Sequence, residues 1–135
     1  CATAELELVS HLRRWGLSTY LRINVVVEDD LFIPDLVVLR RRATNFTAVE
    51  RTDVLLLGEV IADDRPTLID RPRAYAAAGF DHYLVVDARG GGSRLILHRR
   101  EGKAYRPLVA AAAGTTFAMK EPFAFEIDPA ELLDE

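Results

Sequence analysis

The spacing of hydrophobic and polar residues predicts a helix at the start of the chain and a hairpin after it. In residues 2–15 apolar side chains recur every three or four positions with charged residues between them, as in an amphipathic helix. Residues 21–27 then alternate between the two kinds of side chain, and residues 31–39 are again rich in strand-forming residues. Because acidic, turn-forming residues separate the two runs, we expect them to pair as antiparallel strands.

A strand, a helix and a second strand follow. Residues 54–61 are hydrophobic on both faces, which favours a central strand. The next pattern predicts a helix that is capped by Asp70, carries Pro72 in its first turn and ends at Gly79. Residues 83–87 form another apolar run. A strand, a helix and a strand in this order predict a crossover between two parallel neighbouring strands.

The last third of the chain predicts further strands. Residues 94–98 and 103–109 read as a hairpin, and residues 117–127 as an edge strand. We therefore expect an α+β fold, with a mixed sheet that has a helix on either side, in a single domain over residues 1–135. Because the sequence starts without Met and enters a helical pattern at once, we expect residues to precede Cys1.

Composition narrows the class of protein without identifying its function. The chain has 135 residues, of which 50% are hydrophobic and 28% charged, with a formal net charge of -4. These values are typical of a globular domain and exclude a polybasic or disordered chain. Its single cysteine excludes an intramolecular disulfide, so we expect a cytoplasmic protein. No apolar run has transmembrane length, and we expect no membrane partner.

Two acidic residues stand where hydrophobic core residues are expected. Asp35 interrupts the apolar run at residues 33–39, and Glu59 interrupts the run at residues 54–61. A lone charge among buried residues costs several kcal/mol unless it is paired, protonated or bound to a cation. Carboxylate oxygens suit Mg²⁺ or Mn²⁺, so the two acids predict a metal site. On the two acids alone, salt bridges to neighbouring arginines are an equally good interpretation.

A run of three arginines, Arg40, Arg41 and Arg42, opens the connection before residue 54. The run has two interpretations. A solvated loop is the usual outcome for such a charge run, and a patch that contacts phosphate groups is the alternative. Trp15 and the tyrosines are expected in the core rather than on a surface that stacks bases.

Four segments in a fixed order resemble a known protein family. They are Pro34-Asp35, Glu59-Val60, residues 71–80 and residues 82–87. Together they resemble the Uma-two family of proposed restriction endonucleases, within the PD-(D/E)XK nuclease superfamily, over about residues 5–133. In that family a Pro-Asp strand precedes a Glu-Val strand end, a Lys-x-x-x-Tyr-x-x-x-Gly helix and a Tyr-Trp-x-Val-Asp strand. The resemblance implies a restriction-endonuclease-like fold.

The resemblance also implies roles for individual residues. Asp35 and Glu59 would bind Mg²⁺ or Mn²⁺, and the Val60 carbonyl would be a further ligand. Arg71 stands where the family has its catalytic lysine. It can clamp a phosphate and stabilise developing charge, but its pKa prevents it from accepting a proton. Arg73, together with the three arginines above, would contact DNA phosphates. The remaining matches to the family signature are Tyr75, Gly79, Tyr83 and Asp87.

These observations lead to a primary functional hypothesis and two alternatives. The first is a divalent-metal-dependent endonuclease that hydrolyses DNA phosphodiester bonds, as a homodimer by resemblance. The second is a catalytically impaired domain of the same fold that binds nucleic acid or dimerises. The third is a small α+β domain in which the acids pair with arginines. The superfamily often has an acid on its first helix, and here Glu5 or Glu7 could serve, although we expect both on a solvated face.

Overall fold

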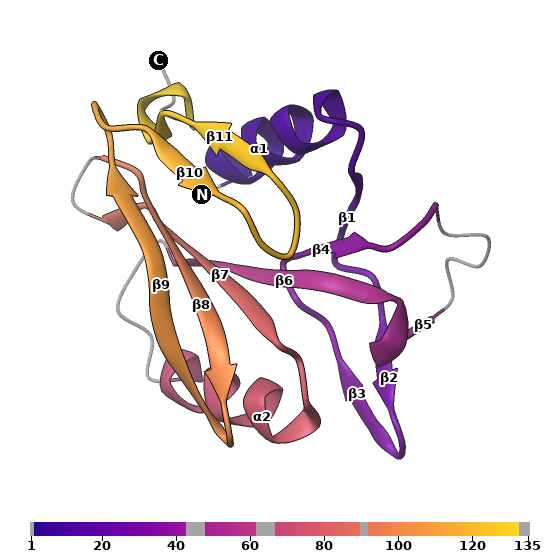
Figure 1. Ribbon diagram of the computed structural model, residues 1–135. Helices are drawn as coiled ribbons and strands as arrows, with labels where there is room; N and C mark the ends of the chain where they lie inside the picture. The colour runs from indigo at the N-terminus through magenta and orange to yellow at the C-terminus, as the bar shows by residue number, and fades with distance from the viewer. Residues whose placement is uncertain (1, 43–47, 62–66, 90–91, 133–135) are drawn as a thin grey trace.

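A central six-stranded sheet organises the chain. The computed structural model describes residues 2–42, 48–61, 67–89 and 92–132. The strand order is β1-β4-β6-β7-β8-β9, in which only β6 and β7 run parallel (Figure 1). The strands are β1 (Ser18–Leu21), β4 (Leu36–Leu39), β6 (Val54–Ile61), β7 (His82–Asp87), β8 (Arg94–Glu101) and β9 (Ala104–Ala112). The sheet is therefore mixed, as the sequence predicts.

Two smaller sheets accompany the central one. One three-stranded sheet has the order β3 (Asp30–Phe32), β2 (Val25–Val27), β5 (Val49–Glu50). A second, two-stranded sheet pairs β10 (Phe117–Met119) with β11 (Phe125–Ile127). The described residues also include the 3₁₀ turns η1 (Arg51–Asp53) and η3 (Pro129–Leu132). In the described parts of the chain, no helix combines the length and hydrophobicity needed to cross a bilayer.

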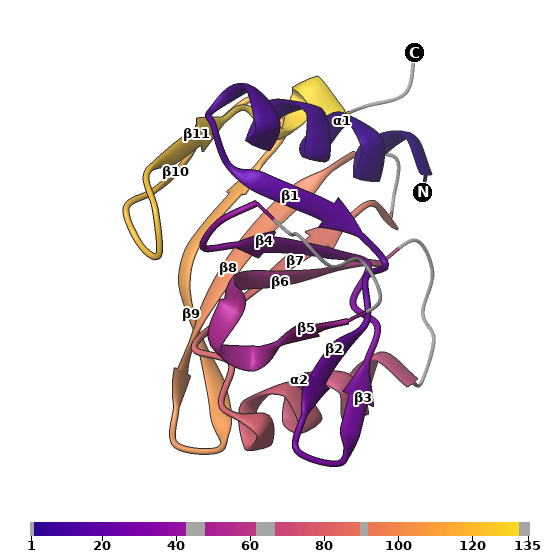
Figure 2. The ribbon, with the colours of Figure 1, turned by 90° about the vertical axis from the view of Figure 1, so that its right-hand side faces the viewer.

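A helix lies on each face of the central sheet. Figure 2 shows α1 (Ala2–Arg14), with β10 and β11, above the sheet and α2 (Thr67–Ala78), with β2 and β3, below it. Each face has its own hydrophobic core. On the α1 face, Leu8 and Leu12 pack with sheet residues such as Leu36, Leu56 and Leu84. The α+β class and the flanking helices are thus confirmed.

The predicted central strand and crossover are confirmed. Strand β6 has the predicted bounds, and it pairs in parallel with β7 after α2. The prediction for the start of α2 is wrong, because the described helix begins at Thr67 and not after Asp70. Pro72 therefore lies inside the helix, where its lack of an N–H removes one backbone hydrogen bond.

The predicted hairpin of two continuous strands is wrong. Each arm is divided between two sheets: β1 and β4 pair in the central sheet, whereas β2 and β3 pair in the small one. Arg22 has a left-handed backbone (φ 48°), which turns the chain out of the central sheet. Its N–H donates to the Asp35 carbonyl at 3.1 Å, where the returning arm re-enters. Asp35 is thereby fixed at the end of β4.

The C-terminal prediction is also wrong in part. Residues 117–127 form the separate hairpin β10-β11 rather than one edge strand of the central sheet. Phe117, Phe125 and Ile127 are buried against the core on the α1 face. Their apolar side chains cover that face instead of extending the sheet.

Candidate metal centre at the ends of β4 and β6

The structure brings Asp35 and Glu59 together. Asp35 immediately precedes β4, and Leu36 lies opposite Gly58 in the antiparallel pair of β4 and β6. The Asp35 N–H donates to Glu59 Oε2 at 3.4 Å, and the Val60 N–H donates to Asp35 Oδ2 at 2.7 Å. These bonds connect the two acids through the backbone. The edge of the Val60 backbone that carries the N–H therefore faces Asp35.

Glu59 is fully buried, with two further donors from α2. Arg71 Nη1 lies 3.0 Å from Glu59 Oε2, and the Tyr75 hydroxyl donates to Glu59 Oε1. The Arg71 side chain is 46% exposed, so it can move without disturbing the core. In this structure Glu59 is thus paired with an arginine, which is one of the two interpretations that the sequence left open.

Burial controls the charge of Glu59. The pKa of this carboxyl is raised from 4.5 to about 7, chiefly by burial and also by the negative charge of Asp35. The hydrogen bond from Tyr75 and the charge of Arg71 lower the pKa, and they only partly offset burial. Glu59 therefore exchanges a proton near neutral pH. Burial and the neighbouring Glu59 raise the pKa of Tyr75, which keeps its hydroxyl as a donor.

Local sequence explains this arrangement. Arg71 and Tyr75 are four residues apart on α2, so both side chains lie on one face of the helix and reach the same carboxylate. Gly58 allows β4 to approach β6, because a Cβ there would lie 3.0 Å from the Leu36 Cγ. Sequence reasoning assigned Tyr75 only to a structural signature. Its spacing from Arg71 was the signal that it could also bind Glu59.

The donor set matches the chemistry of a hard divalent cation. Asp35 and Glu59 supply carboxylate oxygens from adjacent strands, which suits Mg²⁺ or Mn²⁺ when water and substrate complete the coordination. Within the described ranges, no cluster of three or more His, Cys, Asp or Glu side chains could hold a metal. Arg71 occupies one Glu59 oxygen. A cation that used this oxygen would therefore displace the Arg71 guanidinium.

The predicted phosphate-binding arginines lie away from the acid pair. Arg40 is at the opposite end of β4 from Asp35, about 16 Å along the strand at the usual rise per residue. Its Nε donates to the Thr52 carbonyl at 2.8 Å. Arg41 and Arg42 are exposed beside it. The role of this run in binding nucleic acid stays a prediction.

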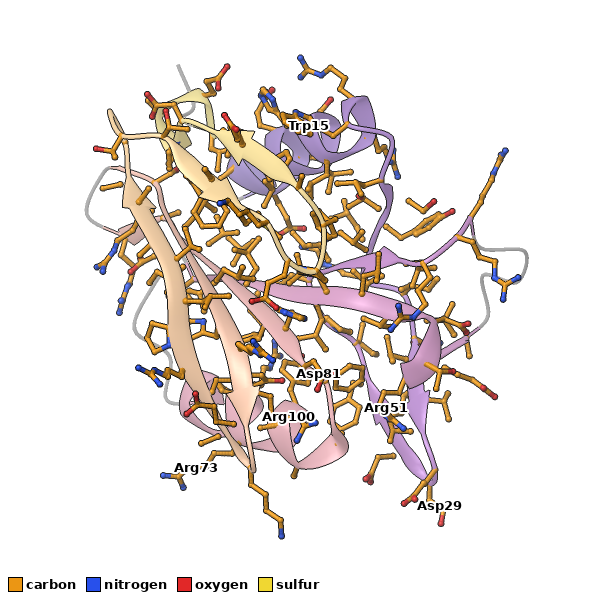
Figure 3. The ribbon with its side chains drawn as sticks, in the orientation of Figure 1. Trp15, Asp29, Arg51, Arg73, Asp81 and Arg100 are labelled. Atoms are coloured by element: carbon orange, nitrogen blue, oxygen red, sulfur yellow. The ribbon has the colours of Figure 1, made fainter. Side chains whose placement is uncertain are left out.

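Arg73 is exposed on α2, and Figure 3 shows it projecting outward from the helix. It is two residues from Arg71, so it lies on a different side of the helix from the Glu59 contact. Its contact with phosphate also stays a prediction.

The first helix contributes an acid that borders this region. Glu5 is 5% exposed and forms an ion pair with Arg22, so the expected solvated position is wrong for this residue. Glu7 is partly exposed. Because the Arg22 N–H donates to the Asp35 carbonyl, Glu5 supports the segment that positions Asp35.

Comparison with known proteins identifies the fold. No family model and no curated protein matches the chain. A solved structure from Anabaena variabilis, described as a "putative nuclease belonging to DUF820", is similar with a TM-score of 0.62 and 11% sequence identity. The match covers 97% of this chain and 78% of that one. The chain therefore shares a nuclease-like α+β fold with that protein.

Proposed function

We propose that the protein is a divalent-metal-dependent nuclease that hydrolyses phosphodiester bonds in DNA. The observation that carries this proposal is the convergence of Asp35 and Glu59, connected through backbone N–H groups at the ends of two adjacent strands. The fold shared with the protein described as a "putative nuclease" supports the same function. The resemblance of the Pro34-Asp35 and Glu59-Val60 segments to the Uma-two family supports it as well.

In this proposal Asp35, Glu59 and the Val60 carbonyl hold Mg²⁺ or Mn²⁺. When bound, such an ion neutralises charge on the scissile phosphate and lowers the pKa of a bound water. The protein's own groups orient the site: the Val60 N–H fixes Asp35, and the Tyr75 hydroxyl fixes Glu59. Once released from Glu59, Arg71 donates hydrogen bonds to the phosphate oxygens.

The remaining arginines would act on the DNA further from the acids. Arg73 and the run Arg40, Arg41 and Arg42 contact backbone phosphates in this proposal, which positions the nucleic acid without selecting a sequence. The lysine expected from the family is replaced by Arg71, which cannot take a proton from water. The attacking water would therefore lose its proton to another group or to solvent.

A second candidate function has a specific observation in its favour. The ion pair between Arg71 and Glu59 places a positive charge where a cation would bind. If this pair persists, the domain would bind nucleic acid without cleaving it. The expected homodimer would then increase the affinity through two binding surfaces.

Nicking of supercoiled plasmid separates the two functions. We expect the wild type to nick DNA with Mn²⁺ and not with EDTA, and Asp35→Ala to lose this activity. Asp29→Ala is the matched control, because Asp29 lies exposed at the tip of the β2-β3 hairpin (Figure 3). Cleavage by Arg71→Lys alone would show that the natural protein is impaired by its arginine. Absence of cleavage in both the wild type and Arg71→Lys would contradict the nuclease function.

A further inference from the structure

A small pocket opens between α2 and strands β7, β8 and β9. Its volume is about 260 Å³, and its lining includes Ile61, Tyr83, Val85 and Tyr105. This volume is just below the ~300 Å³ at which pockets for drug-sized ligands begin, so it suits one small ring system. None of the roles assigned to the acid pair uses this pocket.

The pocket adjoins the acid pair. Val85 lies opposite Glu59 in the parallel pairing of β6 and β7, so the two side chains are neighbours on one face of the sheet. Ile61 is two residues after Glu59 on β6 and therefore points to the same face. A group bound at Glu59 and a ring in the pocket could belong to one ligand.

The wall of the pocket is aromatic and held in place. Tyr83 and Tyr105 stack, with ring centroids 5.2 Å apart and an angle of 29° between the ring planes. The Tyr105 hydroxyl donates to the Phe80 carbonyl at 2.7 Å, which ties β9 to the end of α2. Such a wall gives a flat ring an apolar contact surface with little ordering required.

A few polar groups accompany this apolar lining. Tyr83 is 3% exposed, and its hydroxyl has no hydrogen-bond partner among the described residues. Because every fully buried polar side-chain atom among the described residues has a partner, this hydroxyl keeps some contact with solvent. His98 Nδ1 lies 3.3 Å from the Tyr83 carbonyl, so Nδ1 carries the proton and Nε2 is left as an acceptor. Burial lowers the pKa of His98, which keeps the ring neutral.

The mouth of the pocket carries a positive charge. Arg73 is part of the lining and exposed to solvent. Figure 3 shows it projecting from the outer side of α2. A guanidinium there can contact a phosphate on the chain that delivers a ring into the pocket. An aromatic wall, two polar groups and a cation at the mouth are together the chemistry that recognises a nucleotide.

We propose that this pocket receives a nucleobase that has left its strand, next to the candidate metal centre at Asp35 and Glu59. The inference rests on the proposed nuclease function and specifies its substrate as single-stranded or locally unpaired DNA. A base inside a duplex cannot enter the pocket without losing its pairing and stacking. Unpaired DNA avoids this cost and binds more tightly than a fully paired duplex of the same sequence.

Filling the pocket from its exposed rim tests the proposal. Ala104 lines the pocket and is exposed, so Ala104→Phe places a ring in the pocket without replacing a core residue. Ala110→Phe is the matched control, because Ala110 is exposed on the same strand and outside the pocket lining. The probe is a 12-nucleotide oligothymidylate with one central 2-aminopurine, followed by fluorescence anisotropy in EDTA.

We expect Ala104→Phe to weaken binding about tenfold, the size expected for one lost base stack. It should also abolish the change in 2-aminopurine emission that the wild type produces, whereas Ala110→Phe should behave as the wild type. Tyr83→Phe is a second variant, which removes the unpartnered hydroxyl and keeps the ring. It should weaken binding severalfold without lowering stability.

Two results would overturn the base pocket. One is equal affinity of the wild type, Ala104→Phe and Tyr83→Phe for the probe. The other is wild-type binding to the paired duplex that is as tight as binding to the single strand. If plasmid nicking still depends on Asp35, the nuclease function stands and only the pocket fails. If nicking is absent while the probe binding depends on Ala104, the nuclease function fails and the pocket remains as a nucleotide-binding site.

Discussion

The two faces of the central sheet are made by the same strands but differ in kind. Toward α1, strands β4, β6 and β7 contribute hydrophobic core residues, including Leu36, Leu56 and Leu84. Toward α2, the same strands present Glu59 and Tyr83 among apolar residues. Because successive side chains of a strand alternate between faces, one strand can stabilise the fold on one side and carry chemistry on the other.

The coverings of the two faces explain the difference. On one side α1 and the β10-β11 hairpin seal the core, with Phe117 and Phe125 essentially inaccessible. On the other side α2 supplies Arg71 and Tyr75 to the buried Glu59 and leaves a pocket next to it. A buried carboxylate is tolerated there because it has partners. The α2 face is therefore where function should be sensitive to small changes.

The largest expected effect comes from a substitution on the α2 face, and it is on catalysis. Glu59→Gln keeps the shape of the side chain but removes a charged ligand, so we expect cleavage to fall about a thousandfold, or about 4 kcal/mol in the barrier. The amide oxygen can still accept from Tyr75, which should preserve the fold. Single-turnover cleavage and urea unfolding, measured on the same preparations, check both parts. If Glu59→Gln cleaves DNA as fast as the wild type, Glu59 has no part in the metal centre.

The matching change on the other face should act on stability. Leu56 is fully buried against α1, so Leu56→Ala should lower the free energy of unfolding by about 2–5 kcal/mol. Leu31→Ala is the control, because Leu31 is 57% exposed, and it should change stability by less than about 0.5 kcal/mol. Urea unfolding measures both. Equal losses in the two variants would contradict the assignment of the core.

A somewhat smaller effect should appear in the pH dependence of stability. The folded state raises the pKa of Glu59 from 4.5 to about 7, so it binds a proton that the unfolded state has lost in this range. This contribution is complete below about pH 4.5 and is lost as the pH rises through 7, with a total of up to ~3 kcal/mol. Compared with Glu59→Gln, the wild type should lose stability between pH 5 and pH 8. Parallel stability curves of the two proteins would rule out a raised pKa.

The elements that could be predicted were those whose signal is local. Residues 54–61 form a central strand because both of their faces are hydrophobic, and the crossover to β7 follows from the order of strand, helix and strand. The division of the hairpin could not be predicted. It depends on the left-handed backbone at Arg22, a residue type that gives no signal for that conformation.

In the candidate site the acid pair could be predicted, whereas most of the residues that contact it could not. Asp35 and Glu59 stand out as charges in apolar strands, and the structure brings them together. Their partners were harder to identify. The bond from Tyr75 and the burial of Glu5 arise from the packing of helices on the sheet, which hydrophobic patterns do not specify. The distance of Arg40 from Asp35 likewise follows from their places at opposite ends of one strand.

The most direct test of the central claim is calorimetric titration of Mn²⁺ into the wild type and the Asp35→Ala, Glu59→Ala double variant. We expect the wild type to bind one Mn²⁺ at pH 8 and the double variant to bind none. Between pH 6 and pH 5 the wild-type affinity should fall about tenfold, because a proton then competes for Glu59. Identical heats for the two proteins at pH 8 would contradict a metal centre at Asp35 and Glu59.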